Sequence, residues 1–213
     1  MAFRLQIKQW KLAVLWLGLI FLLTGCGGYT DASVRIPSGW GEYAADPLTF
    51  KFEAGWHEED ADAMAQSINS GTGLFGLKTT AQVVKVLASP RREQGTIDYL
   101  TISCYTTGQD VTAEDLEATM DDLNGMSRTI KNQAGLYADV EQNARIRHYG
   151  SVDALTVAYR LSNDETTCMI QLALIPYEQY IFQIALCDFT QQEDNDYLEA
   201  ILTSLIINEE KES

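Results

Sequence analysis

The chain has 213 residues, with 30 acidic and 15 basic side chains and a formal net charge of −15. That length suffices for one ordinary domain with a substantial hydrophobic core. Nucleic-acid phosphates repel so acidic a protein, which practically excludes nucleic-acid binding. The acidity is typical of an exposed, soluble domain, and it also suits cationic partners or metal ions.

The N-terminus has the three parts of a secretory signal: a basic start, an apolar run over 12–23 and a small-residue exit. The tetrapeptide Leu23–Cys26 (LTGC) resembles the bacterial lipobox, in which signal peptidase cuts before a cysteine that has received a diacylglyceryl group. Two acyl chains at one residue are enough for stable membrane anchoring. The sequence therefore predicts a signal peptide over 1–25 and a mature chain that begins at lipidated Cys26.

Two other interpretations of the N-terminus are a transmembrane helix and an ordinary cleaved signal in which Cys26 has no role. The apolar run over 12–23 is short for a helix that crosses a bilayer, which needs about 20 residues. The signal holds three of the 15 basic residues and no acidic one, so the mature chain keeps 12 basic against 30 acidic residues, a formal charge of −18. We expect such a domain to stand off anionic lipid headgroups.

The mature chain contains three more cysteines, Cys104, Cys168 and Cys187, an odd number that does not suit a disulfide framework. The last two flank a predicted hairpin that turns near 176–178. Pairing Leu172 with Phe182 in this hairpin sorts apolar and polar residues onto matching faces, and it places the two cysteines on opposite faces. The sequence therefore predicts no bridge, and all three are interpreted as small buried or half-buried apolar residues.

The pattern of residues along the chain predicts one α+β domain. Residues 26–46 are small and polar and predict a tether, and alternation over 48–53 predicts the first strand of a domain over 47–208. A capping box and a hydrophobic staple mark a helix that starts after Thr112. The remaining predicted elements are a helix over 57–70, strands over 82–88, 97–105, 137–148, 153–162, 166–175 and 179–188, a helix over 195–207 and a charged tail over 209–213.

This order of elements resembles the PsbP-like family, named for an extrinsic photosystem II protein and found in many bacterial lipoproteins. The resemblance rests on the opening LTFKFEAGW (Leu48–Trp56), the central helix, the following meander and the closing YLEAILTSLII (Tyr197–Ile207). The chain departs from the family at one point. The opening strand of the family often ends in a proline-containing turn before Gly-Trp, and this chain has Glu53 and Ala54 there instead. The resemblance implies an antiparallel sheet packed between helices (an α/β/α sandwich) and non-enzymatic assembly or binding roles, and it transfers no functional residue.

Two sequence motifs resemble ligand sites but lack the required context. Gly71–Gly76 matches G-x-G-x-x-G, yet a predicted helix precedes it and a strand follows, the reverse of a phosphate-binding loop. The acidic runs at 57–62 and 121–125 lack the ligand spacing of zinc and calcium sites, and they are interpreted as solvated helix faces. The sequence therefore predicts no metal site and no cofactor.

Catalytic groups are equally few. His57 and His148 are the two histidines, and Cys104 is a conceivable nucleophile, but no nucleophile elbow or known Cys–His signature surrounds them. We interpret His148 as an edge residue between a strand and a turn. Trp40 and Trp56, which could line a sugar or peptide cleft, are interpreted as core and rim residues.

The sequence thus favours a non-enzymatic lipoprotein on the outer face of the cell membrane, anchored in the lipid bilayer through acylated Cys26. Its predicted role is an interaction or assembly module that recognises another envelope protein. The alternative is a lipoprotein that binds a small ligand or a cation for uptake or sensing. The short tether and the lack of a disulfide framework favour a Gram-positive cell.

Overall fold

The computed structural model describes residues 31–32, 34–63, 82–89, 98–125, 137–162, 167–189 and 196–208. The predicted signal peptide, the lipidation residue Cys26, the glycine-rich motif Gly71–Gly76 and the charged tail over 209–213 lie outside these ranges. Asp31–Ser213 form one compact unit. No helix within the described ranges is both long enough and apolar enough to cross a membrane.

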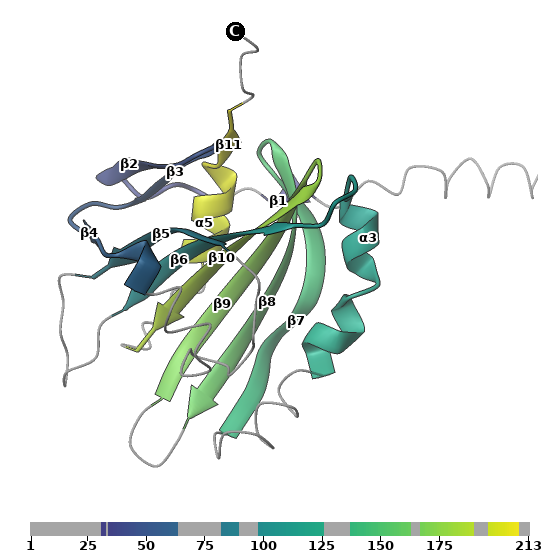
Figure 1. The fold of residues 1–213 in the computed structure, drawn as a ribbon. Coiled ribbons are helices and arrows are strands. Elements are labelled where there is room, and N and C mark those ends of the chain that lie inside the picture. Colours follow the sequence, from purple (N-terminus) through teal and green to yellow (C-terminus); the bar gives the residue numbers. More distant parts are fainter. Residues whose placement is uncertain are drawn as a thin grey trace, which may run out of the picture. The chain divides into compact units, whose positions relative to one another are not determined.

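A large sheet dominates the described part of the chain (Figure 1). Its eight strands follow the order β1-β7-β8-β9-β10-β6-β5-β4, and all neighbours are antiparallel except β1 and β7. The long central strands follow one another in the chain, so simple hairpins build the middle of the sheet. The bounds are β1 Asp31–Ala32, β4 His57–Glu58, β5 Gln82–Ala88, β6 Tyr99–Thr106, β7 Tyr137–Tyr149, β8 Val152–Ser162, β9 Thr167–Tyr177 and β10 Tyr180–Asp188.

One face of the large sheet is covered by a second, three-stranded sheet and by the helix α5 (Tyr197–Thr203). The small sheet has the order β11-β3-β2, with β2 at Trp40–Ala45, β3 at Leu48–Glu53 and β11 at Ile206–Ile207. Strand β3 buries alternate residues, as its sequence predicts. Its buried side chains pack with those of α5 against β6, β9 and β10; the central members are Leu48, Phe50, Phe52, Ile102, Ile175, Ile184, Ile201 and Leu202.

The other face of the large sheet is covered by α3 (Ala113–Glu117) and by helical backbone over 120–125. The predicted cap is confirmed, because Thr112 and Asp115 form a reciprocal capping box at the start of α3. Leu116 packs onto alternate residues of β8 and β9. The hydroxyl of Tyr159 on β8 donates to the Leu123 carbonyl oxygen at 2.7 Å, which fastens the helical segment to the sheet.

Three predicted elements have different bounds in the structure. The closing helix ends at Thr203 instead of continuing to 207, because Ile206 and Ile207 pair with Thr49 and Leu48 as strand β11. The folded region also starts before the predicted boundary at 47, since β1 and β2 lie within the predicted tether of 26–46. The predicted helix over 57–70 begins instead with β4, and the backbone is helical over 61–63; residues 64–70 lie outside the described ranges.

The predicted register of the β9–β10 hairpin is wrong. The turn is a two-residue loop, Glu178–Gln179, and Tyr177 pairs with Tyr180, so Leu172 faces Ala185 and not Phe182. Pro176 signalled a turn, but it lies within β9 beyond Leu174, the last residue that pairs with β8. A proline is tolerated there because pairing on that side has ended. The predicted register is shifted by three residues, an odd number. Side chains that it placed on opposite faces of the sheet therefore lie on the same face.

Candidate functional site

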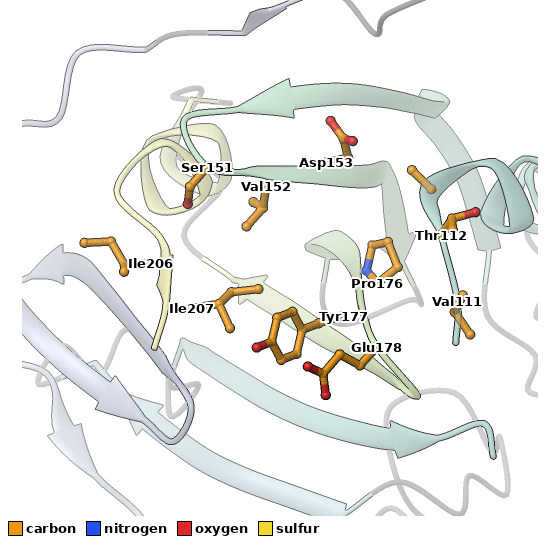
Figure 2. Close-up of a pocket in the computed structure, with 11 residues that line it drawn as sticks. Val111, Thr112, Ser151, Val152, Asp153, Pro176, Tyr177, Glu178, Ile206 and Ile207 are labelled. Carbon is orange, nitrogen blue, oxygen red and sulfur yellow. The ribbon is translucent and has the colours of Figure 1, made fainter. Parts of the chain in front are cut away.

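An open groove of about 570 Å³ lies where four chain segments meet (Figure 2). The segments are the entry to α3, the turn between β7 and β8, the end of β9 with its turn, and β11. Its lining combines apolar side chains with a few polar ones and contains no lysine, arginine or histidine. The lining residues are Val111, Thr112, Ala113, Ser151, Val152, Asp153, Pro176, Tyr177, Glu178, Ile206 and Ile207.

Hydrogen bonds to backbone carbonyl oxygens hold the walls of the groove together. The Val111 N–H donates to the carbonyl oxygen of Glu178 at 2.7 Å, which joins the entry of α3 to the β9–β10 turn. The Ser151 hydroxyl donates to the carbonyl oxygen of Leu205 at 2.8 Å, which joins the β7–β8 turn to the segment before β11. Glu178 has a φ of 50°, the left-handed region that few non-glycine residues adopt. The groove is therefore built from turns that are fixed by contacts distant in the sequence.

The charge of the groove comes from Asp153 and Glu178, since neither has a basic residue among the other lining residues. Asp153 accepts a hydrogen bond from His148, with Nδ1 of the ring 2.9 Å from Oδ1. This hydrogen bond is the main reason why the pKa of His148 lies above its ordinary value, and the charges of Asp153 and Asp31 raise it further. The lining of the groove thus combines two carboxylates with apolar side chains.

An aliphatic side chain is exposed at the margin of the groove, on the side of β11 opposite to Ile207 (Figure 2). Ile206 on β11 is 55% exposed, and among the large hydrophobic residues of the described ranges Tyr137 alone is similarly exposed, at 56%. Strand β11 pairs with β3 and has no second neighbour in the described part of the small sheet. An apolar side chain on an edge strand, beside an acidic groove, is a combination that suits a segment of another protein.

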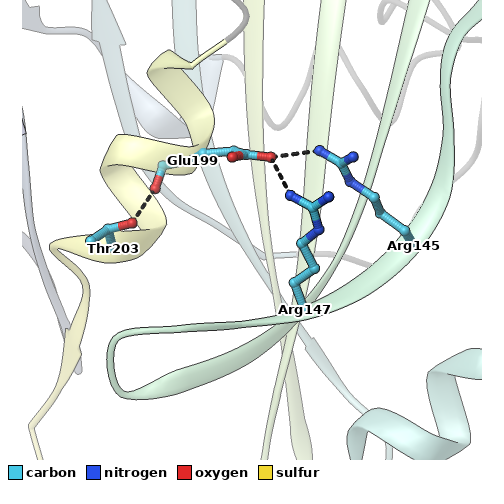
Figure 3. A network of polar contacts seen from close by, with 4 residues as sticks. All are labelled: Arg145, Arg147, Glu199 and Thr203. Carbon is cyan, nitrogen blue, oxygen red and sulfur yellow. Dashed lines mark hydrogen bonds and ion pairs between the residues drawn. The ribbon is translucent and has the colours of Figure 1, made fainter. Parts of the chain in front are cut away.

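A second polar cluster lies under α5 (Figure 3). Glu199 on α5 accepts from two arginines on β7: Oε1 is 2.6 Å from Nη2 of Arg145 and 3.5 Å from Nη1 of Arg147. The Glu199 side chain is 15% exposed, and both arginines are about one-third exposed. The carboxylate pairs with both guanidinium groups, so this cluster anchors α5 to the sheet.

The structure does not bring the sequence-predicted candidates together into a site. Nε2 of His57 lies 2.8 Å from Oε1 of the exposed Glu59, and no group of three or more His, Cys, Asp or Glu in the described ranges could hold a metal ion. The acidic run at 121–125 is helical. Cys104 is half-buried on β6, and burial raises the pKa of its thiol, which disfavours the nucleophilic thiolate.

The two tryptophans proposed as core or rim residues pack in an aromatic cluster around Phe52. Trp40 stacks on Tyr197 with ring centroids 5.6 Å apart, and Trp56 meets Phe52 edge-to-face at 4.7 Å. This cluster joins β2 and β3 to α5, which is the packing role that the sequence predicts. None of these rings lines the groove.

Comparison with solved structures identifies the fold. The cyanobacterial PsbP protein (CyanoP) from Synechocystis sp. PCC 6803 matches with a TM-score of 0.56 and 14% sequence identity, over 83% of this chain and 97% of that chain. LpqN, described as involved in cell envelope biogenesis of Mycobacterium tuberculosis, matches with a TM-score of 0.47 and 10% identity, over 83% of each chain. No protein-family model and no curated protein sequence matches this chain.

The chain therefore has the PsbP-like α+β fold that its sequence predicts. At 14% identity, the likeness to CyanoP shows the fold alone, and no residue role is carried over. Local sequence patterns do not mark Glu178, Asp153 or Ile206 as site residues, because the groove joins segments that are far apart in the chain. The one local signal for the groove is the predicted turn of the β9–β10 hairpin. Because of Pro176, the predicted register placed this turn too early in the chain.

Proposed function

We propose that this chain is a non-enzymatic interaction module that binds a basic, partly apolar segment of another envelope protein in the acidic groove. The observation that carries the proposal is the groove lining: two carboxylates with no basic side chain among the lining residues, and exposed Ile206 at the margin of the groove. A partner with lysine or arginine next to an aliphatic residue would complement both features. The overall charge of −15 would also speed association with a basic partner.

The proposed location is the outer face of the cell membrane. The lipobox-like sequence Leu23–Cys26 supports anchoring through an acylated cysteine, and the acidic domain would remain clear of anionic headgroups. A Cys26→Ala variant tests this part separately. We expect the variant to lose radiolabelled fatty acid and to leave the membrane fraction, and retention of both label and membrane binding would contradict lipidation at this residue.

Site-specific photo-crosslinking in intact cells tests the binding function. A photoreactive phenylalanine analogue is placed at Ile206 in the full-length chain, and the matched control carries the same analogue at Tyr137, which is 56% exposed and lies outside the groove. We expect a discrete protein adduct from position 206 and none from position 137. The same adduct from both positions, or no adduct from 206, would overturn the proposal.

The charge requirement is tested by Glu178→Asn in the chain that carries the crosslinker at 206. Asparagine tolerates a positive φ, so this change removes the carboxylate while the backbone of the turn is kept. A charge-assisted hydrogen bond contributes about 1.5–3 kcal/mol, so we expect the adduct to fall by about tenfold or more. Added salt should weaken it in the same direction. An adduct that responds to neither change would contradict recognition by charge.

A small cationic ligand is the second candidate for the same groove, because its volume of about 570 Å³ is in the range of small-molecule sites. The melting temperature of the protein in a panel of amines, polyamines and divalent cations separates the two functions. A ligand at 100 times its dissociation constant adds about 2.7 kcal/mol of stability. A clear rise with one compound that Glu178→Asn abolishes would favour ligand binding over the interaction module.

A further inference from the structure

Cys168 and Cys187 lie on adjacent central strands with their sulfur atoms 3.0 Å apart. Cys187 on β10 pairs with Ile170 on β9, and Cys168 lies two residues before Ile170 on the same strand. Residues two apart on a strand point to the same face, and the two cysteines are therefore diagonal neighbours on one face of the sheet. Both are 5% exposed and belong to the core under α3.

The third cysteine is separated from this pair. Cys104 pairs with Phe182 on β10, and Phe182 differs from Cys187 by five positions, so the two side chains point to opposite faces. Cys104 packs with the core under α5, whereas the other two pack with the core under α3. The odd cysteine count thus resolves into one pair and one single thiol.

We propose that Cys168 and Cys187 form an intramolecular disulfide in the exported protein. A disulfide bond is about 2.05 Å long, so the two sulfur atoms need to approach by about 1 Å, a movement within reach of small χ1 rotations. The bond would tie the β9–β10 hairpin at the end opposite its turn. The sequence expectation that no bridge forms rested on a register that the structure contradicts.

The reaction is thiol–disulfide exchange with a disulfide oxidant, such as oxidised glutathione or an exported thiol oxidase. The thiolate of one cysteine attacks the oxidant and displaces one thiolate, and the second cysteine, as its thiolate, then attacks the resulting mixed disulfide and displaces the other. Two protons leave the cysteines, and the two electrons reduce the S–S bond of the oxidant. Export, which the N-terminal signal predicts, would bring the chain into a compartment where such oxidants act.

The surroundings of the pair determine when the bond forms. The hydrogen bond with Cys168 and burial raise the pKa of Cys187, and the negative charges of Asp98 and Asp188 act in the same direction. Thiolate is therefore scarce once the core is closed, and oxidants have little access to residues that are 5% exposed. We infer that the bond forms before the core closes, and that the same burial then protects it from reductants.

Thiol mapping of the full-length chain from the membrane fraction tests the proposal. The protein is denatured without reductant, alkylated and digested. We expect alkylated Cys104, a linked peptide pair that contains Cys168 and Cys187, and a mass lower than that of the reduced chain by two hydrogen atoms. Alkylation of both cysteines of the pair in this protein would overturn the proposal.

Melting in the presence and absence of reductant gives a second readout. Closing a loop by a disulfide typically stabilises a domain of this size enough to shift its melting temperature by about 5–10 °C. We expect dithiothreitol, added to the unfolded chain before refolding, to lower the melting temperature of wild type and of the control Cys104→Ala. The double variant Cys168→Ala/Cys187→Ala should not respond. An equal response in all three proteins would contradict the assignment, and thiol mapping decides the question if the double variant fails to fold.

Discussion

Glu199 on α5 and Arg145 on β7 form an ion pair with an O···N distance of 2.6 Å, 54 residues apart in the chain. Arg147 approaches the same carboxylate oxygen at 3.5 Å. The helix covers the core through Leu198, Ile201 and Leu202, and this carboxylate fixes its polar side against β7. The short closing helix is therefore attached by both an apolar and an ionic contact.

We predict that Glu199→Gln lowers the free energy of unfolding by about 1–2 kcal/mol, because it leaves two partly buried guanidinium groups without their counter-charge. Urea denaturation measures the change. The matched control is Glu141→Gln, which removes the carboxylate that pairs with Arg160 at 2.9 Å on an exposed part of the sheet. Exposed pairs contribute little, so the control should change stability by less than about 0.5 kcal/mol. Equal losses of unfolding free energy in the two variants would show that the Glu199 ion pairs stabilise the protein no more than an exposed pair does.

We predict that Gly150→Ala is strongly destabilising. Gly150 lies in the β7–β8 turn with a φ of 57°, and a Cβ there would lie 2.9 Å from the carbonyl oxygen of Thr203 at the end of α5. Backbone would have to move on one side or the other. Strain in the left-handed region and this contact together should cost more than about 2 kcal/mol, as measured by urea denaturation.

The control for this variant is Gly108→Ala. Gly108 also has a positive φ, 76°, but a Cβ there would meet no atom within 4 Å. It should lose about 1 kcal/mol, the cost of the left-handed conformation alone. A Gly150→Ala protein as stable as the Gly108→Ala protein would show that the turn can shift away from α5 without cost.

Most strands of this fold are predictable from local patterns, because a half-buried strand alternates and a central strand is apolar on both faces. The strands over 82–88 and 153–162 match β5 and β8 to within one residue. The start of α3 is also predictable from local sequence, because the capping box is formed by Thr112 and Asp115, which are three residues apart. These elements follow from neighbouring residues alone.

The errors concern contacts that depend on distant residues. Ile206 and Ile207 continue the apolar helical pattern, but pairing with β3 outweighs helix propensity and makes them a strand. The small sheet was not predicted either, because β2 (WGEYAA) lacks the regular alternation of apolar and polar residues that marks a strand. The acidic groove and the cysteine pair depend on a hairpin register that is set by a two-residue turn, which the sequence does not mark with glycine or asparagine.

Tyr159→Phe tests the attachment of the helical segment over 120–125. The change removes the hydrogen bond from the buried hydroxyl to the Leu123 carbonyl oxygen, and we expect a loss of about 1–2 kcal/mol. Tyr43→Phe is the control: its hydroxyl donates to the Glu53 carbonyl oxygen at 3.0 Å in a half-buried position, where water can replace it. The control should lose less than about 0.5 kcal/mol.

The same residue gives a prediction at alkaline pH. Burial raises the pKa of Tyr159 to about 12. A raised pKa in the folded state means that its stabilising contribution is present below the ordinary tyrosine pKa of 10.0 and is lost as the pH rises toward 12. The stability of wild type relative to Tyr159→Phe should therefore fall across this interval. A difference that does not change with pH would contradict burial of the hydroxyl.

His148 and Asp153 give a final prediction near neutral pH, at the margin of the groove. The hydrogen bond to Asp153 raises the pKa of His148 above 6.5. The contribution of this pair is therefore fully present below pH 6.5, the ordinary histidine value, and is lost as the pH rises through the higher folded-state pKa. We expect wild type to exceed Asp153→Asn in stability more at about pH 5.5 than at about pH 9.

The control for this prediction is the His148→Asn background. Without the imidazole, Asp153→Asn should have the same effect at both pH values, because the ring whose pKa the pair raises is then absent. NMR titration of the His148 ring gives an independent measurement, with a midpoint above 6.5 in wild type and a lower one in Asp153→Asn. If the midpoint does not change, the hydrogen bond is not what raises the pKa, and the contribution of Asp153 to the groove would be its charge alone. Binding at the groove would then depend on salt but not on the protonation of His148.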